Sequence, residues 1–209
     1  MPLYKTITVS DTTKVLIWKI EESVAELSRD ITLTPNCEQR LSDMSSELHQ
    51  RGFLSVRQLL KVAGYTPAEL YYNCDGRPHL TDGKEISITH SFIFSGIIIS
   101  DRPVGIDIEK QREKIGRIAN KFVDYEYSFL DNSHMRELTV VWCIKESLYK
   151  LFATRGLSFK QHTQVIPFHM DDAVAKAWIK YRSDVRKYHL DFLEFEGFTA
   201  AWATEHPTT

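Results

Sequence analysis

The chain has 209 residues, of which 43% are hydrophobic and 26% are charged, and its formal net charge is −2. This composition supports one large or two small folded domains, and the weak net charge argues against a nucleic-acid-binding protein. No apolar run approaches the roughly 20 residues that a bilayer-spanning helix needs, so we expect no membrane segment.

The cysteines and the N-terminal segment indicate the cellular setting. Cys37, Cys74 and Cys143 are odd in number and widely spaced, which fits neither a disulfide framework nor a pair of zinc-binding motifs. The first residues lack the apolar core of a secretion signal. We therefore expect a reduced, cytoplasmic protein.

The first half of the chain is expected to combine helices with short strands. Thr34 and Pro35 have the pattern of a helix start, with the threonine as the cap and the proline in the first turn. The helical region that follows should extend to about Val62, with a break near Gly52. Residues 73–78 are rich in turn formers. Further expected elements are a strand at 15–20, a short helix at 21–28, and strands at 85–90 and 94–100.

Residues 103–110 carry two acidic residues in a strand pattern. Asp107 and Glu109 alternate with isoleucines, so the two carboxylates are expected on one face and the isoleucines on the other. Two carboxylates this close repel one another unless a cation lies between them, and oxygen ligands suit a hard ion such as Mg²⁺. Considered alone, the same two residues also fit an ordinary solvated strand face.

The segment from 133 to 153 has the periodicity of an amphipathic helix. Trp142, Glu146 and Lys150 are spaced four residues apart and therefore follow one another along one side. Together with the two acids of the preceding strand, the glutamate and the lysine favour a site that handles a metal ion and a phosphate. The opposite side of this helix is apolar and should pack on the core. Its members are Val141, Ile144, Leu148, Leu151 and Phe152.

The second half repeats the combination of helices and strands. A helical region is expected at about 115–130, and strands are expected at 173–181, 187–195 and 198–203. Each half thus offers helices and a small antiparallel sheet, which predicts an α+β protein of two lobes. We place the lobes at residues 1–102 and 103–209.

Five short motifs follow one another within about residues 50 to 160. They are Gly76-Arg77-Pro78, Ser87-Ile-Thr89-His90-Ser91, Gly105-Ile-Asp107-Ile-Glu109, Trp142-x-x-Lys145-Glu146-Ser147-x-x-Lys150 and Arg155-Gly156-Leu157-Ser158. A single one of these would be a weak signal, but five in this order are specific. Together they resemble the 4'-phosphopantetheinyl transferases, in particular the surfactin-synthetase-activating (Sfp) type.

The resemblance implies both an architecture and a reaction. The family is built as two lobes related by a pseudo-twofold axis, with coenzyme A and the active site between them. Its members transfer the 4'-phosphopantetheine arm of coenzyme A to a serine of an apo acyl or peptidyl carrier protein and release adenosine 3',5'-bisphosphate. The resemblance thus implies an Mg²⁺-dependent enzyme, with Mn²⁺ as an alternative ion, that acts as a monomer.

In the second lobe, the resemblance implies the metal and catalytic residues. Asp107, Glu109 and Glu146 would bind the metal ion. Glu146 would also act as the general base for the carrier serine, and Lys150 would contact the pyrophosphate and stabilise the charge that develops there. Lys145 would contribute to coenzyme A binding, although an ordinary lysine on a helix surface fits this position as well.

In the first lobe, the resemblance implies residues that bind the nucleotide of coenzyme A. The family has a basic residue after a glycine near the adenine and the 3'-phosphate, and here that residue is Arg77. The family's arginine for the 3'-phosphate has no clear match, and Arg51 or Arg40 stands in its place. The coenzyme A-binding residues implied for this lobe are Arg51, Asp75, Gly76, Arg77, Thr89 and His90.

Two other functions use the same residues. A metal-dependent phosphoester hydrolase would employ the same acids but would cleave coenzyme A without an acceptor. A non-catalytic module that binds coenzyme A or a carrier would have no need of Asp107, Glu146 and Lys150, so their presence favours an enzyme. Fatty-acid, polyketide and peptide-synthetase carriers all stay open as acceptors.

Overall fold

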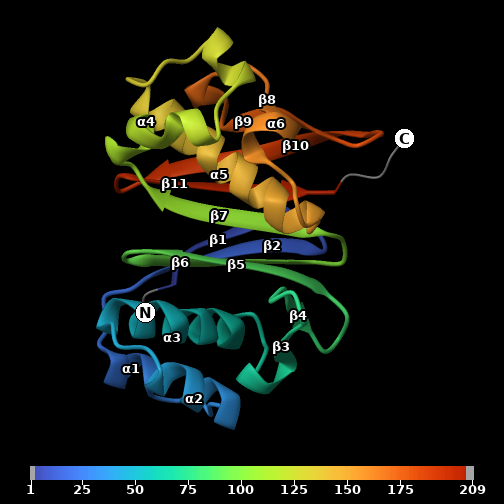
Figure 1. Cartoon of the computed structure of the whole chain (residues 1–209). Helices are drawn as coiled ribbons and strands as arrows, with labels where there is room; N and C mark the ends of the chain where they lie inside the picture. The colour runs from blue at the N-terminus through green and yellow to red at the C-terminus, as the bar shows by residue number, and fades with distance from the viewer. Residues whose placement is uncertain (1–2, 206–209) are drawn as a thin grey trace. The chain divides into compact units, whose positions relative to one another are not determined.

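The computed structural model of the chain describes residues 3–205. Within this range the backbone forms two compact units, which divide between Asp101 and Arg102. Each unit combines helices with an antiparallel sheet (Figure 1), so the expected mixture of helices and antiparallel strands is confirmed.

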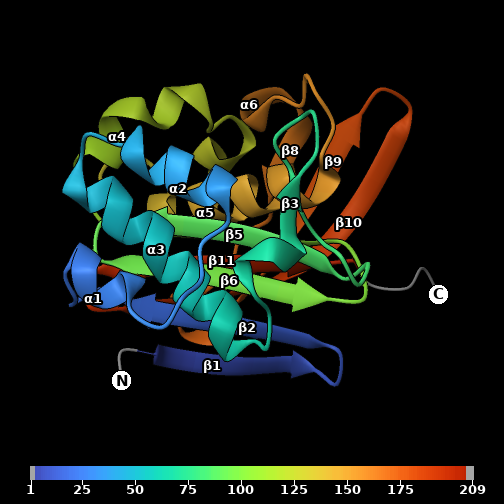
Figure 2. The ribbon, with the colours of Figure 1, turned by 90° about the horizontal axis from the view of Figure 1, so that it is seen from below.

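The first unit is built on a four-stranded antiparallel sheet. Its strands, in order across the sheet, are β1 (Leu3–Ser10), β2 (Thr13–Lys19), β6 (Phe94–Ser100) and β5 (Glu85–Ser91). Its other elements are α1 (Val24–Ser28), α2 (Pro35–Ser42), α3 (Glu47–Val62), η1 (Pro67–Glu69), β3 (Leu70–Tyr72) and β4 (Pro78–Leu80). Figure 2 shows α3 across one face of the sheet, where Leu54 and Leu59 share a buried cluster with Ile97 of β6.

The helices of the first unit confirm one expectation and correct another. Thr34 caps α2, because its hydroxyl accepts a hydrogen bond from the backbone N–H of Cys37 at 3.2 Å. The break in the helical region lies at residues 43–46 and not at Gly52, which is buried within α3. The ring of His90 lies over this glycine, 3.4 Å from the place where a Cβ would stand. The glycine therefore marks a packing contact and not the end of a helix.

The second unit is a five-stranded antiparallel sheet with one long helix packed along it. Its strands, in order across the sheet, are β7 (Val104–Lys110), β11 (Phe198–Thr204), β10 (Asp184–Phe195), β9 (Val174–Tyr181) and β8 (Thr163–Val165). Its helices and helical turns are α4 (Lys114–Ile118), η2 (Ala119–Lys121), η3 (Tyr125–Ser128), α5 (Met135–Phe152), α6 (Phe159–His162) and η4 (Met170–Asp172). The long helix and four of the five strands, namely β7, β9, β10 and β11, were expected from periodicity alone.

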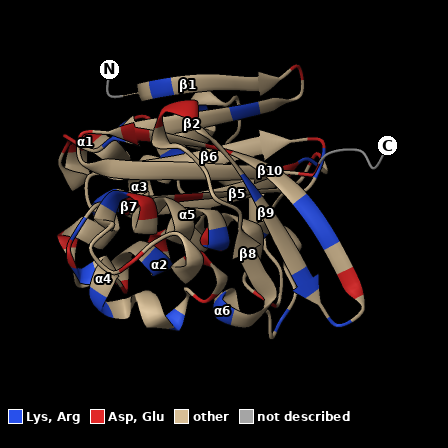
Figure 3. Ribbon diagram, turned by 90° about the horizontal axis from the view of Figure 1, so that it is seen from above, with Lys and Arg blue, Asp and Glu red and all other residues tan. Residues whose placement is uncertain are grey.

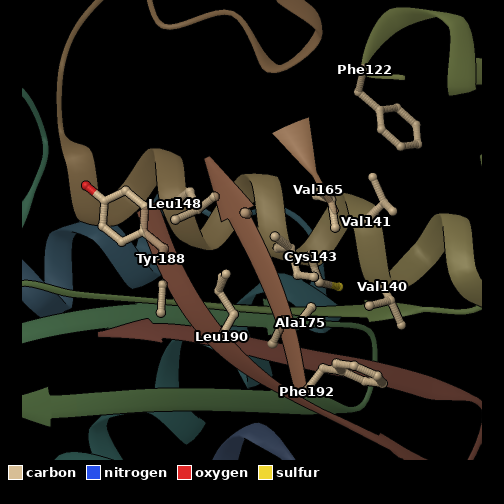
Figure 4. Packing of buried hydrophobic residues seen from close by; sticks show 14 of the residues in the cluster. Phe122, Val140, Val141, Cys143, Leu148, Val165, Ala175, Tyr188, Leu190 and Phe192 are labelled. Carbon is tan, nitrogen blue, oxygen red and sulfur yellow. The ribbon is translucent and has the colours of Figure 1, made fainter. Parts of the chain in front are cut away.

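The apolar side of α5 is buried against the sheet. Val141 and Leu148, which the helical periodicity predicts as core residues, have no exposed surface. Both belong to a buried cluster that also includes Leu190 and Phe192 of β10, and Figure 4 shows Val141 beside Val165 in it. Complete burial of an aliphatic side chain of this size contributes roughly 1.5–3 kcal/mol. These contacts fix the rotation of α5 about its axis and so leave its polar side facing away from the core.

The segment between β7 and α5 does not form the continuous helix expected at 115–130. It consists of α4, which continues directly into η2, and of η3, which is separated from η2 by residues 122–124. The backbone carbonyl of Phe122 accepts a hydrogen bond from Nζ of Lys145 at 2.7 Å, and the carboxylate of Glu126 is completely buried beside the same ammonium. Because a buried charge needs such partners, the chain departs from helical geometry here to supply them.

In both units the main strands and the long helix follow one another along the chain in the same order. In the first unit β2, α3, β5 and β6 follow one another along the chain, and β6 lies between β2 and β5 in the sheet. In the second unit β7, α5, β10 and β11 do the same, and β11 lies between β7 and β10. Both units thus contain a strand, a long helix and a hairpin whose last strand pairs with the first strand.

Gly105 determines how closely α5 approaches β7. A Cβ at this position would lie 1.9 Å from the carbonyl oxygen of Ser147 on α5, which is far inside van der Waals contact. The hydroxyl of Ser147 in turn lies 2.8 Å from the carbonyl oxygen of Ala201 on β11 and can donate a hydrogen bond to it. The absence of a side chain at Gly105 therefore lets the helix backbone lie directly on the strand.

Substitution of this glycine is expected to be severely destabilising. In Gly105→Ala the new methyl group has no space, so α5 must move away from β7, and we expect a loss of about 3 kcal/mol or more in the free energy of unfolding. Gly52→Ala is the matched control, because it introduces the same group into a helix with only an ordinary contact to His90. It should change stability by less than about 1 kcal/mol. Urea denaturation of both variants would contradict this account of the helix–strand contact if the two losses were equal.

Candidate active site

Asp107 on β7 and Lys150 on α5 form the centre of a polar cluster in the second unit. Nζ of Lys150 lies 2.9 Å from Oδ1 of Asp107 and donates a second hydrogen bond, at 2.8 Å, to the backbone carbonyl of Ile106. The Asp107 side chain is buried, whereas that of Lys150 is 28% exposed. The lysine therefore reaches across the helix–strand contact to a buried carboxylate and keeps part of its surface open to a ligand.

Glu146 lies one helical turn before Lys150 and completes this cluster. Burial and, to a smaller extent, the charges of Asp107 and Glu109 raise the pKa of Glu146 to about 7, against the opposing effect of the Lys150 ammonium. Glu109 is half-buried on β7, two residues beyond Asp107 and on the same face. The structure thus brings together the four residues expected from the sequence to carry the chemistry. A carboxylate with a pKa near neutrality is suited to take up and release a proton.

The raised pKa of Glu146 predicts a specific dependence of stability on pH. Its folded-state pKa of about 7 lies above the ordinary value of 4.5, so ionisation is harder in the folded protein than in the unfolded chain. The protonated form therefore contributes stability that is fully present below about pH 4.5 and is lost as the pH rises through 7. Glu146→Gln should remove this loss, and at about pH 8 in EDTA the variant should be more stable than the wild type by up to roughly 2–3 kcal/mol.

Urea denaturation across this pH range would measure the difference. The gain should vanish below about pH 4.5, where the wild-type carboxyl is protonated in both states. Glu137→Gln, on the same helix but outside the cluster, is the control and should show no such trend. A constant difference between wild type and Glu146→Gln at every pH would contradict the assignment.

The cluster has the donor chemistry of a site for a hard divalent cation. Its carboxylates supply only oxygen ligands, and their mutual repulsion would be relieved by a cation. Among residues 3–205, no three His, Cys, Asp or Glu side chains stand in the arrangement of a formed metal site. Mg²⁺ is commonly held by one or two carboxylates, with water and substrate phosphates as its other ligands, so this donor set fits it.

Lys145, which was expected among the coenzyme A-binding residues, lies in the interior of the second unit beside Glu126. Its side chain has no exposed surface. Nζ lies 2.8 Å from Oε1 of Glu126 and donates to the backbone carbonyls of Phe122, Phe159 and Thr163 at 2.7, 3.0 and 3.1 Å. Burial lowers the pKa of this lysine, and the carboxylate of Glu126 opposes the shift. An ammonium surrounded in this way has no donor left for a ligand.

Glu126 is the residue of this unit that sequence reasoning did not identify. It lies between two exposed tyrosines in η3, in a stretch where charged and aromatic residues alternate. Its Oε1 also accepts a hydrogen bond from the backbone N–H of Val165 at 2.7 Å. Nothing in the local pattern distinguishes this acid from its exposed neighbours, because its burial depends on a partner on α5.

The first unit places three of its expected residues in one hairpin loop, between β3 and β4. The side-chain oxygen of Asn73 accepts hydrogen bonds from the backbone N–H groups of Asp75 and Arg77 at 3.0 and 2.9 Å. Gly76 has a φ of 78°, a conformation that favours glycine. The guanidinium of Arg77 pairs with Glu85 at 2.8 Å. The loop is therefore preformed by its own hydrogen bonds.

The other expected residues of the first unit lie on α3 and β5. His90 is exposed and packs over Gly52, the residue next to Arg51, whereas Thr89 is buried. The guanidinium of Arg51 donates to the backbone carbonyl of Ile20 at 3.0 Å. Its Nε is buried and has no hydrogen-bond partner within the described part of the chain. The structure thus brings His90 close to the segment that carries Arg51.

A comparison with known protein families gives a match to the second unit. Residues 103–205 match the family model of the 4'-phosphopantetheinyl transferase superfamily, and the matched range includes Asp107, Glu109, Glu146 and Lys150. The match supports a transferase of the phosphopantetheine class, a class that uses coenzyme A and carrier proteins and typically a divalent metal. No curated protein matches the chain. None of the helices that the structure describes is both long enough and apolar enough to cross a bilayer.

Proposed function

We propose that the protein transfers the 4'-phosphopantetheine arm of coenzyme A to a serine of an apo acyl or peptidyl carrier protein and releases adenosine 3',5'-bisphosphate. The observation that carries this proposal is the Asp107–Glu146–Lys150 cluster within the matched region. It combines a carboxylate of raised pKa with an ammonium that is partly open to solvent. Proton removal from a hydroxyl and neutralisation of a pyrophosphate need these two groups.

The proposed reaction is a displacement at the β-phosphate of coenzyme A. The carrier serine oxygen forms a bond to phosphorus, its proton passes to Glu146, and the bond from phosphorus to the bridging oxygen breaks. Lys150 lies one turn further along α5 and stabilises the negative charge that collects on the departing phosphate. Asp107 holds the ammonium of Lys150 in place at 2.9 Å. When bound by Asp107, Glu109 and Glu146, Mg²⁺ or Mn²⁺ would neutralise part of the pyrophosphate charge.

We assign the nucleotide of coenzyme A to the expected first lobe, residues 1–102. The preformed loop of Asp75, Gly76 and Arg77 would contact the adenine, and Thr89 and His90 would contact the phosphates. Arg51 is our candidate for the 3'-phosphate, because a planar guanidinium can donate two hydrogen bonds to a phosphate.

The proposal extends to the type of transferase. The order of strand, helix and hairpin that the units share supports two lobes of common design, as in the surfactin-synthetase-activating type. The free cysteines Cys37, Cys74 and Cys143 support a reducing, cytoplasmic setting. A chain that supplies both nucleotide-binding and catalytic residues would act as a monomer.

Mass spectrometry of an intact apo carrier protein tests the reaction directly. With this protein, coenzyme A and Mg²⁺, the carrier should gain one phosphopantetheine group, and EDTA should prevent the gain. Asp107→Asn and Glu146→Gln should each lower the rate by about 10²-fold or more, because the first variant weakens metal binding and the hold on Lys150, and the second lacks the proposed base. Glu137→Gln is the matched control on α5 and should keep full activity.

The outcomes distinguish the alternatives. Release of adenosine 3',5'-bisphosphate without a change in carrier mass would indicate a hydrolase. Binding of coenzyme A without any product, in wild type and in Asp107→Asn alike, would indicate a non-catalytic module. Full activity in a folded Glu146→Gln would remove the glutamate from the mechanism.

Lys150 is expected to act more on turnover than on binding. Its ammonium faces charge that grows as the bridging bond breaks, so Lys150→Ala should lower kcat by about 10²-fold while the KM for coenzyme A changes by less than about tenfold. Lys114→Ala, an exposed lysine on α4, is the control. Steady-state kinetics that showed an unchanged kcat and a raised KM would make Lys150 a binding residue only.

A further inference from the structure

Glu146 lies between two different surfaces along α5. On one side are the acids of β7, which raise its pKa. On the other side are Trp142 and Tyr149, which lie four residues before it and three residues after it and are therefore its neighbours on the helix surface. The environment of the proposed base depends on what holds these two rings in place.

The ring of Phe159 on α6 packs against the rings of both Trp142 and Tyr149. The centroid of its ring lies 5.7 Å from that of Trp142 and 5.5 Å from that of Tyr149, and both pairs pack edge to face. Trp142 makes a further edge-to-face contact with Phe122 at 5.0 Å. Trp142, Tyr149 and Phe159 thus form a continuous aromatic wall beside Glu146, and each such pair contributes about 0.5–1.5 kcal/mol beyond burial.

The buried Glu126–Lys145 pair anchors this wall through the backbone. Nζ of Lys145 donates to the carbonyls of Phe159 and Phe122, the residues whose rings contact Trp142. Glu126 neutralises the ammonium and also accepts a hydrogen bond from the backbone N–H of Val165 at the end of β8. One buried ammonium on α5 therefore ties two separate segments, 119–128 and 159–163, to the helix that carries Glu146.

We propose that Lys145 is a positioning residue of the transferase, which together with Glu126 holds the aromatic wall against Glu146. This inference rests on the proposed function. The geometry shows how the pair acts: the ammonium donates to three backbone carbonyls from two segments at once, and its buried charge in turn requires the carboxylate of Glu126. Loss of one member of the pair leaves the other as an uncompensated buried charge, whereas loss of both does not.

The kinetic test compares Lys145→Met, Glu126→Gln and the double variant at a temperature where each is folded. Each single variant should lower kcat by up to about 10²-fold with little change in the KM for coenzyme A, because the wall is displaced while the coenzyme site is untouched. The double variant should recover most of kcat, because no buried charge is left unpaired. Lys114→Met is the control for loss of a lysine.

Two kinetic results would overturn the inference. A raised KM for coenzyme A with unchanged kcat, and no recovery in the double variant, would make Lys145 a ligand of coenzyme A. An unchanged kcat in all three variants would make the pair purely structural. Should a single variant not fold, Phe159→Leu tests the wall directly. It removes the ring contacts and keeps the carbonyl that Lys145 binds, so kcat should fall with an unchanged KM, and an unaltered kcat would refute the proposal.

Fluorine NMR of fluorotryptophan-labelled protein separates this inference from the proposed function, since it needs no activity. The signal of Trp142 is assigned with Trp142→Phe. It should shift or broaden in Lys145→Met and Glu126→Gln and return towards the wild-type position in the double variant. A signal that stays fixed in the single variants would overturn the anchoring of the wall. Absence of transfer by the wild type, together with the expected NMR shifts, would refute only the transferase.

Discussion

The direct contact between α5 and β7 is the constraint on which the candidate site depends. Gly105 has no Cβ, so the carbonyl of Ser147 lies against the strand, and this closeness lets Lys150 reach Asp107 and the backbone of Ile106. The apolar side of the helix fixes its rotation, and Glu146 is placed beside the acids of β7 as a result. Packing and chemistry are therefore set by the same helix–strand contact.

The charges of this region are arranged in two different ways. Figure 3 shows basic and acidic residues distributed over both units, as expected for a chain with little net charge. Around Lys145 the charges are buried, matched one to one and fully hydrogen-bonded, which suits a residue that positions its surroundings. Around Glu146 the carboxylates of Asp107 and Glu109 outnumber the single, partly exposed ammonium of Lys150, and burial together with this excess of negative charge raises the pKa of Glu146. Such perturbed groups are typical of sites that bind or transform a ligand.

The sequence was sufficient for elements whose pattern is local. The alternation of Asp107 and Glu109 with isoleucines and the four-residue spacing of Glu146 and Lys150 follow from the geometry of a strand and a helix, and the structure has both. The strands β1, β3, β4 and β8 were not expected, because they are short or polar and depend on their sheet partners. The role of Lys145 was not predictable either. Its burial requires Glu126 and carbonyls from two other segments, and no spacing rule links these positions.

The dependence of Lys145 on Glu126 also has a consequence for the way this fold can change over time. Because either charge alone would be left buried without its partner, a neutral residue at one position is tolerated only with a neutral residue at the other. Single replacements would be removed by selection and paired replacements would be retained. Positions 126 and 145 should therefore co-vary among related sequences, and a lysine at position 145 should be lost only where the acid at position 126 has also been lost.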